Sequence, residues 1–200
     1  MRRKEFEVKD REKIDEVLKK AAIGYLSFNG ADGWPRITPV NFFYEGKIFW
    51  HGAVGGERFE CLKQDPRATF VAVSAQLYLP SHFLSEENAT SATAAFKSVQ
   101  VRGRCKFIED LEEKCLAINR LMEKYQPEGR FKKVSPSEPM YGKVLRATGV
   151  YALAVEQVSA KFKLAQNKSR EDRQKIISRL IERGGPPDLL IAEEVRNTLK

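Results

Sequence analysis

Residues 35–53 decide the fold, and they read PRITPVNFFYEGKIFWHGA. β-Branched and aromatic side chains dominate this stretch, and a Glu45-Gly46 pair interrupts it. The pattern predicts two strands joined by a tight turn, Pro35–Tyr44 and Lys47–His51. Because a proline cannot donate to a strand ladder, Pro39 indicates an edge strand, a bulge or an opening of a barrel.

Further strands are predicted on both sides of this hairpin. Ile23–Phe28 precedes it, and Ala68–Ser74 and Ala147–Val158 follow it. In Phe96–Phe107, apolar and charged residues alternate, which is typical of a strand with one buried face. Hairpin turns join most of these strands, so we expect a mainly β fold with an antiparallel sheet that is closed, or nearly closed, into a barrel.

Helical periodicity accompanies the strands. Asp10 is the expected N-cap of a first helix, because apolar residues follow at positions 14, 17, 18 and 21. Further helices are predicted over 57–63, 110–125 and in the tail, where Ser169 begins one helix, Gly184–Pro187 ends it, and 188–199 forms another. Residues 75–95 are expected to form a long excursion and 126–146 a loop. We predict a barrel domain over 1–165 and a C-terminal helical extension over 166–200.

Composition limits the function classes. The net charge of +8 suits an anionic ligand, nucleic acid or an anionic membrane surface. Basic and acidic residues alternate, as in Asp10-Arg11-Glu12-Lys13, which indicates a solvated surface; nucleic acid is not expected as a partner. The three cysteines have no zinc-type spacing, so no metal site is predicted. No signal peptide and no membrane span are expected, and the reduced thiols suit a cytoplasmic protein.

Three groups of segments stand out by their order and spacing. They are Ile37–Tyr44 with Gly46–Ala53, Gly55–Leu62 with Asp65–Phe70, and Phe96–Arg104 with Glu112–Lys114. Together they resemble the pyridoxamine 5'-phosphate oxidase-like family of FMN-binding split β-barrels, especially its nitroimidazole-resistance branch. The resemblance covers roughly residues 1–160. Lys161–Lys168, followed by Glu171-Asp172-Arg173, is similar to the C-terminal segment of PaiB-type FMN-binding proteins, which are described as negative regulators of transcription.

An FMN site needs a cation and donors for the phosphate, an apolar slot for the ring system and polar groups at the ring edge. Arg58 follows Gly55-Gly56 at the start of a predicted helix, where backbone N–H groups favour an anion. Its guanidinium can offer two parallel donors to a phosphate. The resemblance implies that Arg58 binds the FMN phosphate; the alternative is an exposed surface arginine.

The resemblance implies further cofactor contacts. Those expected to line the flavin ring, the ribityl chain or the wall of the pocket are Pro39, Val40, Asn41, His51, Gly52, Ala53, Ser98, Val99, Lys163, Gln166 and Asn167. Ser98 and Val99 match a second subunit's contribution or the pocket wall. A cation such as Lys163 near the N1–C2 edge of the ring would stabilise negative charge there. The plainer alternatives are ordinary strand residues and, for the last three, a solvated segment leading into a helix. No catalytic residue is identified.

The resemblance implies an FMN-dependent reductase or oxidase that acts on a small organic substrate with an electron donor. A small barrel leaves the flavin half exposed, so we expect a homodimer whose second subunit completes the site. The vitamin-synthesising oxidase is not expected, because the Arg-Leu-Asn-Pro ending of that enzyme is replaced by Arg196–Lys200. Two alternatives stay open: a non-catalytic flavin-binding regulator of PaiB type, and haem or a deazaflavin in the same slot.

Overall fold

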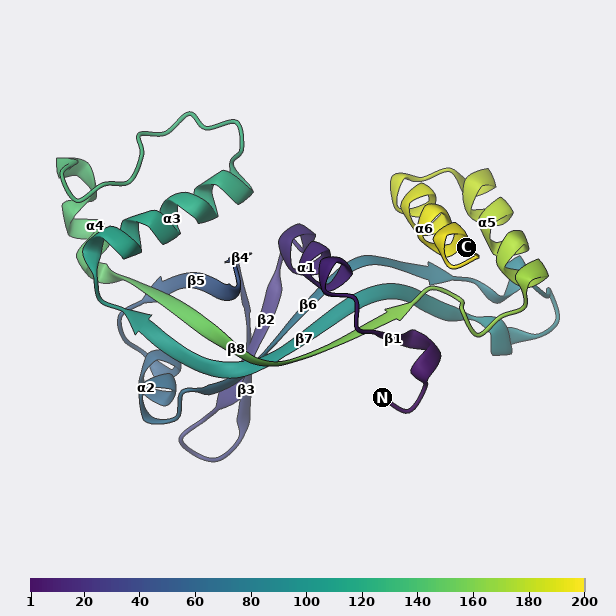
Figure 1. Ribbon diagram of the computed structural model, residues 1–200, viewed down its shortest axis with the longest axis horizontal. Helices are drawn as coiled ribbons and strands as arrows, with labels where there is room; N and C mark the ends of the chain where they lie inside the picture. Colours follow the sequence, from purple (N-terminus) through teal and green to yellow (C-terminus); the bar gives the residue numbers. More distant parts are fainter. Residues whose placement is uncertain (200) are drawn as a thin grey trace. The chain divides into compact units, whose positions relative to one another are not determined.

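A computed structural model describes residues 1–199, which form eight strands and six α-helices (Figure 1). The strands are β1 (Glu7–Val8), β2 (Gly24–Asn29), β3 (Pro35–Val40), β4 (Phe42–Tyr44), β5 (Lys47–Ala53), β6 (Arg67–Leu79), β7 (Thr93–Ile108) and β8 (Thr148–Lys163). The helices are α1 (Arg11–Lys20), α2 (Glu57–Gln64), α3 (Leu111–Tyr125), α4 (Gly142–Ala147), α5 (Arg170–Arg183) and α6 (Pro186–Asn197). Among these residues, none of the helices combines the length and the apolar character that a membrane span requires.

Contacts between residues divide the chain into two compact units. Unit 1 contains Met1–Val17, Val73–Val99 and the chain from Ser159 onward, and unit 2 contains Leu18–Ala72 and Gln100–Val158. The long strands β6, β7 and β8 contribute residues to both units. The domain boundary predicted at residues 165 and 166 stays a prediction.

Unit 2 contains the barrel strands. The order of the strands in the sheet is β3-β2-β6-β7-β8-β5-β4. β3 and β4 therefore lie at opposite ends of the order, although only Asn41 separates them in the sequence. A sheet whose first and last strands are consecutive in the chain must curl until those edges meet. The barrel is thus closed at Asn41, as the predicted split-barrel class requires.

The prediction of one continuous strand over Pro35–Tyr44 was wrong. The strand breaks at Asn41, and its two halves take different partners: Val40 pairs with Gly24, whereas Phe42 pairs with Trp50. Phe42, Phe43 and Tyr44 are all buried, so no alternation of polar residues marks the change of partner. Pro39 lies in β3, an end strand of the order, as its missing N–H requires.

Helix α3 covers one face of this unit, over β4 and β5 (Figure 1). Its buried Ala117 and Leu121 pack against Phe43, Val150 and Ala152 of the strands. The Tyr125 hydroxyl donates to the carbonyl of Ala22 at 2.7 Å and accepts from the N–H of Phe42 at 2.9 Å. This hydroxyl therefore holds the backbone immediately after the Asn41 corner.

Two predicted irregular segments are more regular than expected. Within 75–95, residues 75–79 continue β6 to Leu79 and 93–95 begin β7, with two 3-10 helices, Ser81–Phe83 and Ala89–Ser91, between them. Ladder hydrogen bonds are made by the backbone, so small Ser, Ala and Thr side chains do not prevent pairing. The loop predicted over 126–146 contains α4, whose Leu145 packs with Cys115 and Val134.

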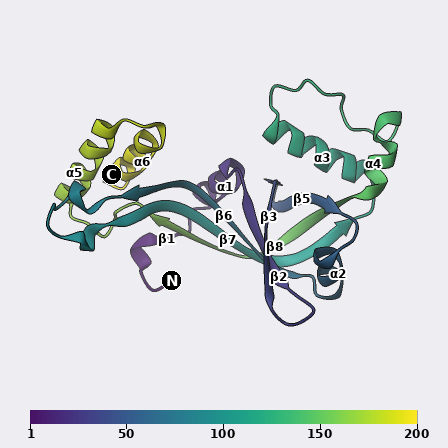
Figure 2. The same cartoon turned by 180° about the vertical axis from the view of Figure 1, so that it is seen from behind.

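The tail helices belong to unit 1 and lie side by side, as Figures 1 and 2 both show. The Ser169 hydroxyl caps α5 by accepting from the N–H of Asp172, and Gly184 ends the helix in the left-handed region at φ 71°. Ile177 and Leu180 of α5 are buried, as are Ile191 and Val195 of α6. The predicted C-terminal helices are confirmed, with α6 beginning at Pro186 because proline suits the first turn of a helix.

Candidate functional site

The candidate site in unit 2 centres on Arg58, in the first turn of α2. Gly56 precedes the helix with φ 84°, and the side chain of Arg58 reaches β5. An ideal Cβ placed on Gly52 would lie 2.0 Å from Nη2 of Arg58. The guanidinium therefore occupies space that only a glycine leaves open at this position of the strand.

Arg58 has no carboxylate partner. The arginines nearby in the sequence do: Arg36 binds Glu57 at 2.7 Å, and Arg67 binds Asp65 at 2.8 Å. Among residues 1–199, no ion pair or hydrogen bond to a protein group engages the Arg58 guanidinium. Its Cζ lies 5.8 Å from the centroid of the Tyr151 ring. Its donors are thus held in place by ring packing and remain available to an anion.

A cluster of aromatic rings supports this guanidinium. Tyr151 stacks on Trp50 with ring centroids 5.4 Å apart, and Phe107 meets Tyr151 edge to face at 5.1 Å. Phe59, the residue after Arg58, meets Phe107 in the same manner at 5.3 Å. The Tyr151 hydroxyl donates to the carbonyl of Ala53 at 2.8 Å. These contacts fix the ring beneath Arg58 to the end of β5.

A cavity of about 340 Å³ adjoins the cluster on the side of α2. Phe59, Phe107 and Tyr151 line it together with Cys105 and Lys106. Burial raises the pKa of the Cys105 thiol to about 12, so this sulfur stays protonated at neutral pH. The lining is mostly apolar, with Lys63, Lys106 and Glu109 as its charged members. The cavity is within the size range of small-molecule sites and adjoins the residues that hold Arg58.

Polar groups lie at the same end of the β4–β5 hairpin. Phe42 pairs with Trp50, so Asn41, which precedes Phe42, and His51, which follows Trp50, both lie at this end of the hairpin. Burial and the charge of Arg58 lower the pKa of His51 below 6.5, so the imidazole is neutral at pH 7. A neutral imidazole has one donor and one acceptor, which suits recognition of a polar ring edge.

The model of the pyridoxamine 5'-phosphate oxidase family matches residues 10–162. This chain belongs to that family. The predicted fold class, an antiparallel split β-barrel with C-terminal helices, is confirmed by the sheet and by solved structures with the same fold. A search of the curated proteins finds no match.

Three solved structures illustrate the fold of this family member. A protein from Bacteroides thetaiotaomicron, assigned to 5-nitroimidazole antibiotic resistance, is 23% identical with a TM-score of 0.63, over 78% of this chain and 85% of its own. The flavocytochrome Anf3 from Azotobacter vinelandii is 22% identical with a TM-score of 0.66, over 84% and 75%. An FAD- and heme-binding protein from Mycobacterium smegmatis is 18% identical with a TM-score of 0.66, over 90% and 80%. At these identities the likeness shows the fold alone.

One group of the predicted cofactor residues lies in unit 2 of this family member. Val40 ends β3 and Asn41 forms the corner after it. His51, Gly52 and Ala53 end β5, where Gly52 lies against the Arg58 guanidinium. Pro39 is exposed in β3 and pairs with Tyr25. Their role in binding a cofactor stays a prediction. Tyr151, Phe107 and Phe59 were missed, because nothing in their local pattern separates them from ordinary core aromatics.

The other predicted residues belong to unit 1. Val99 is fully buried, and the Ser98 hydroxyl lies 3.4 Å from the carbonyl of Lys161. The Gln166 side chain stays within its own turn, accepting from the N–H of Leu164 and donating to the carbonyl of Phe162. Lys163 and Asn167 line a small cavity of this unit. Gln166 therefore holds the turn that carries Asn167, and the predicted roles of these residues at a cofactor stay predictions.

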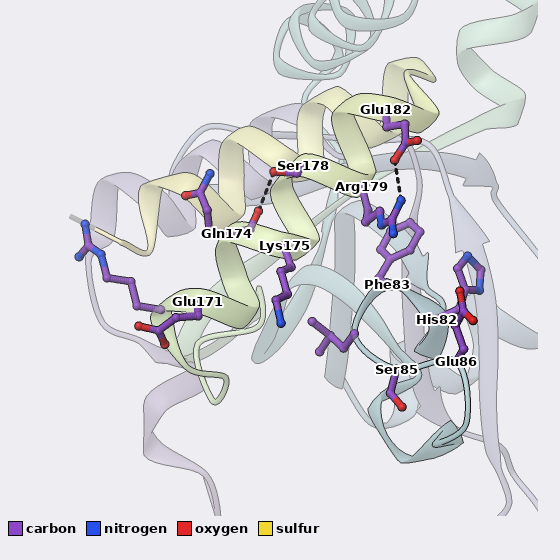
Figure 3. A pocket seen from close by; sticks show the side chains of 12 residues that line it. His82, Phe83, Ser85, Glu86, Glu171, Gln174, Lys175, Ser178, Arg179 and Glu182 are labelled. Carbon is purple, nitrogen blue, oxygen red and sulfur yellow. Dashed lines mark hydrogen bonds and ion pairs between the residues drawn. The ribbon is translucent and has the colours of Figure 1, made fainter.

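Unit 1 also contains a wide groove of about 850 Å³ between residues 82–86 and α5 (Figure 3). Its charges balance: Arg170, Lys175 and Arg179 line it with Glu86, Glu171 and Glu182. Figure 3 shows the 2.9 Å ion pair between Arg179 and Glu182 along one helix. Such a mixed surface does not select a charged ligand. No group of metal-ligating side chains is found in the described part of the chain.

Proposed function

We propose that this chain binds FMN at the Arg58 site and acts as an FMN-dependent oxidoreductase on a small organic substrate. The observation that carries the proposal is the Arg58 guanidinium, which has no carboxylate partner among residues 1–199 and is held over Gly52 and Tyr151. Because no carboxylate engages this guanidinium, its two parallel N–H donors remain available to a phosphate. The structural neighbours include a flavocytochrome and an FAD- and heme-binding protein, which agrees with a flavin in this fold.

The residues present fit the parts of FMN. Arg58 would hold the phosphate, Gly52 would let the cofactor approach the strand, and Asn41 and His51 would offer polar contacts to the ring. The apolar walls of the neighbouring cavity would take the ring or its substrate. When bound, the flavin supplies the hydride chemistry, while the protein binds, orients and shields the reactants. Within the family we favour the nitroimidazole-resistance branch, given the Bacteroides neighbour.

The homodimer is part of the proposal. Large apolar side chains are exposed on β2, on β3 and in the turn between them: Tyr25 of β2 is 47% exposed, Ile37 of β3 71% and Trp34 of the turn 72%. Such a patch on an end strand is typical of a surface that another chain covers. We expect light scattering to report a dimer for the wild type and a monomer for Ile37→Asp. Leu116→Asp, at an exposed leucine on α3, is the matched control and should leave the dimer intact.

An absorbance spectrum tests the cofactor. Purified protein is mixed with FMN, the excess is removed, and the retained flavin bands are compared between wild type and Arg58→Gln. We expect retention by the wild type and its loss in the variant. Arg104→Gln removes the same charge from an exposed arginine of β7 that pairs with Glu156, and it should retain FMN. A wild type that retains no FMN would contradict the cofactor, and haem and a deazaflavin would then be titrated by the same readout.

A turnover assay tests the oxidoreductase separately from binding. FMN-loaded protein is given NADH or NADPH with nitroaromatic and quinone acceptors, and oxidation of the nicotinamide is followed. We expect oxidation by the wild type that falls with FMN occupancy in Arg58→Gln. Firm FMN binding without oxidation of either donor would contradict the enzymatic proposal and leave the binding proposal standing.

A further inference from the structure

Unit 1 holds a small cationic cavity that the Arg58 site does not use, although Lys163 and Asn167 in it were expected at the flavin. It measures about 180 Å³ and is formed by the ends of β6, β7 and β8, the segment between β6 and β7, the turn after β8 and Arg3 near the N-terminus. Its volume is below the roughly 300 Å³ at which sites for drug-sized ligands begin. A ligand of this cavity must therefore be small.

The charges of the cavity are all positive. Arg3, Lys163 and Lys168 line it, and no aspartate or glutamate does. Among residues 1–199, none of these three cations forms an ion pair. The groove along α5, by contrast, has three glutamates for its three basic residues. This cavity thus differs from its surroundings in the sign of its charge.

Elsewhere, unit 1 provides carboxylates for its enclosed cations. Lys97 is 7% exposed and pairs with Glu194, and Arg183 pairs with the buried Asp188. Lys163 instead donates to the hydroxyl of Thr93. Burial and the charges of Lys161 and Arg3 lower the pKa of Lys163. The charged form of its ammonium is therefore disfavoured at this position, and a bound anion would stabilise it.

The turn that carries Lys168 is rigid and strained. Ala165 is buried and adopts φ 62°, a left-handed conformation that an alanine rarely takes. The Gln166 side chain accepts from the N–H of Leu164 and donates to the carbonyl of Phe162, both of which precede Ala165. The N–H of Lys168 donates to the carbonyl of Ala165 at 2.9 Å. Strain of this kind is typical of functional sites, and here it places Lys168 and Asn167 at the cavity.

We propose that this cavity binds the phosphate group of a small anion, independently of the flavin. Arg3, Lys163 and Lys168 neutralise its charge, and the side-chain amide of Asn167 lines the same space and offers a further donor. Two sources share this chemistry, inorganic phosphate and a small phosphate monoester. The cavity is too small for the ring system of a flavin, which separates this site from the Arg58 site.

The experiment is a calorimetric titration of the full chain with inorganic phosphate and with glycerol phosphate, at constant ionic strength set with chloride. It is carried out in the Arg58→Gln background, so that its result does not depend on whether FMN binds at Arg58. Lys163→Met and Lys168→Gln each remove one lining charge. Lys175→Gln removes the same charge from the α5 groove and serves as the matched control. Lys163→Arg keeps the charge, and circular dichroism without phosphate confirms that each variant folds.

We expect saturable binding, weakened about tenfold or more in Lys163→Met and in Lys168→Gln by loss of a charge-assisted contact. Lys163→Arg and Lys175→Gln should bind within about twofold of the parent protein, a difference of well under 1 kcal/mol by the same relation. If glycerol phosphate binds more tightly than inorganic phosphate, the site is assigned to a monoester. If the two bind equally, the site is assigned to inorganic phosphate. Absence of saturable binding, or an equal loss in Lys175→Gln, would overturn the proposal. If FMN displaces phosphate stoichiometrically from the wild type, the proposal that the phosphate site is independent of the flavin is overturned.

Discussion

The guanidinium of Arg58 occupies the space where a side chain at Gly52 would begin: its Nη2 lies 2.0 Å from the position of an ideal β-carbon on Gly52. The two residues come from a helix and a strand that are joined by Val54, Gly55 and Gly56. The contact couples the conformation of the guanidinium to the size of residue 52, and it allows the position of the cation to be tested without removing its charge.

Gly52→Ala is expected to displace Arg58 and to weaken FMN retention. The clashing atom is the end of a flexible side chain, so the free energy of unfolding should change little, by about 1 kcal/mol or less. Flavin retention and thermal unfolding are measured together. Gly55→Ala is the control, since a Cβ there meets no atom within 4 Å. Equal FMN retention in both variants would contradict the placement of Arg58.

The pKa of His51 depends on the charge of Arg58 and can be measured without a cofactor. Burial and, secondly, the charge of Arg58 lower this pKa below 6.5. Arg58→Gln removes one of these causes, so the pKa should rise towards 6.5, as followed by NMR titration of the imidazole. Because the neutral form is favoured in the fold, His51 costs stability as pH falls through 6.5, and this cost should shrink in the variant.

The hydroxyl of Tyr125 is expected to stabilise the Asn41 corner. Tyr125→Phe leaves the N–H of the buried Phe42 without its 2.9 Å acceptor. The free energy of unfolding should fall by about 1–3 kcal/mol, the cost of an unsatisfied buried donor. Urea denaturation measures it. Tyr141→Phe, which removes a more exposed hydroxyl bonded to the carbonyl of Lys132, should cost less; the reverse order would show that the corner does not depend on Tyr125.

Gly103 permits the close approach of β7 and β8. An ideal Cβ there would lie 1.7 Å from the carbonyl oxygen of Ala154, which is backbone and cannot move aside as a side chain can. Gly103→Ala should therefore lower the free energy of unfolding by about 3 kcal/mol or more, as overpacking does when it shifts the backbone. Gly142→Ala, where a Cβ meets no atom within 4 Å, should be neutral or slightly stabilising in the thermal melts that compare the two.

Cys105 should make the protein less stable in alkali. Its pKa is about 12 in the fold, against 9.0 for an ordinary thiol. Above pH 9 the unfolded chain releases this proton while the folded chain keeps it, so stability falls by about 1.4 kcal/mol per pH unit until pH nears 12. The wild type and Cys105→Ala are compared by urea denaturation from pH 8 to 10.5. Parallel curves would show that the thiol ionises equally in both states.

Much of the fold could be predicted because its signals are local. The caps Asp10 and Ser169 bond backbone N–H groups two or three residues away, and the turn at Gly46 lies between strands that pair directly. Pro39 indicated an end strand because its own ring removes the donor. Such features depend on a few neighbouring residues, which a sequence shows directly.

Only the tertiary structure decided the rest. The change of strand partner at Asn41 depends on β2 and β5. The extension of β6 to Leu79 and the start of β7 at Thr93 depend on backbone pairing that small side chains do not reveal. The sequence singled out Arg58 and Lys163, but it could not show that neither has a carboxylate partner or that Tyr151 lies beneath Arg58. The sequence thus determined the local elements and the family, because these depend on short-range geometry. Which charges stay unpaired depends on contacts between residues tens of positions apart, and folding alone brings those residues together.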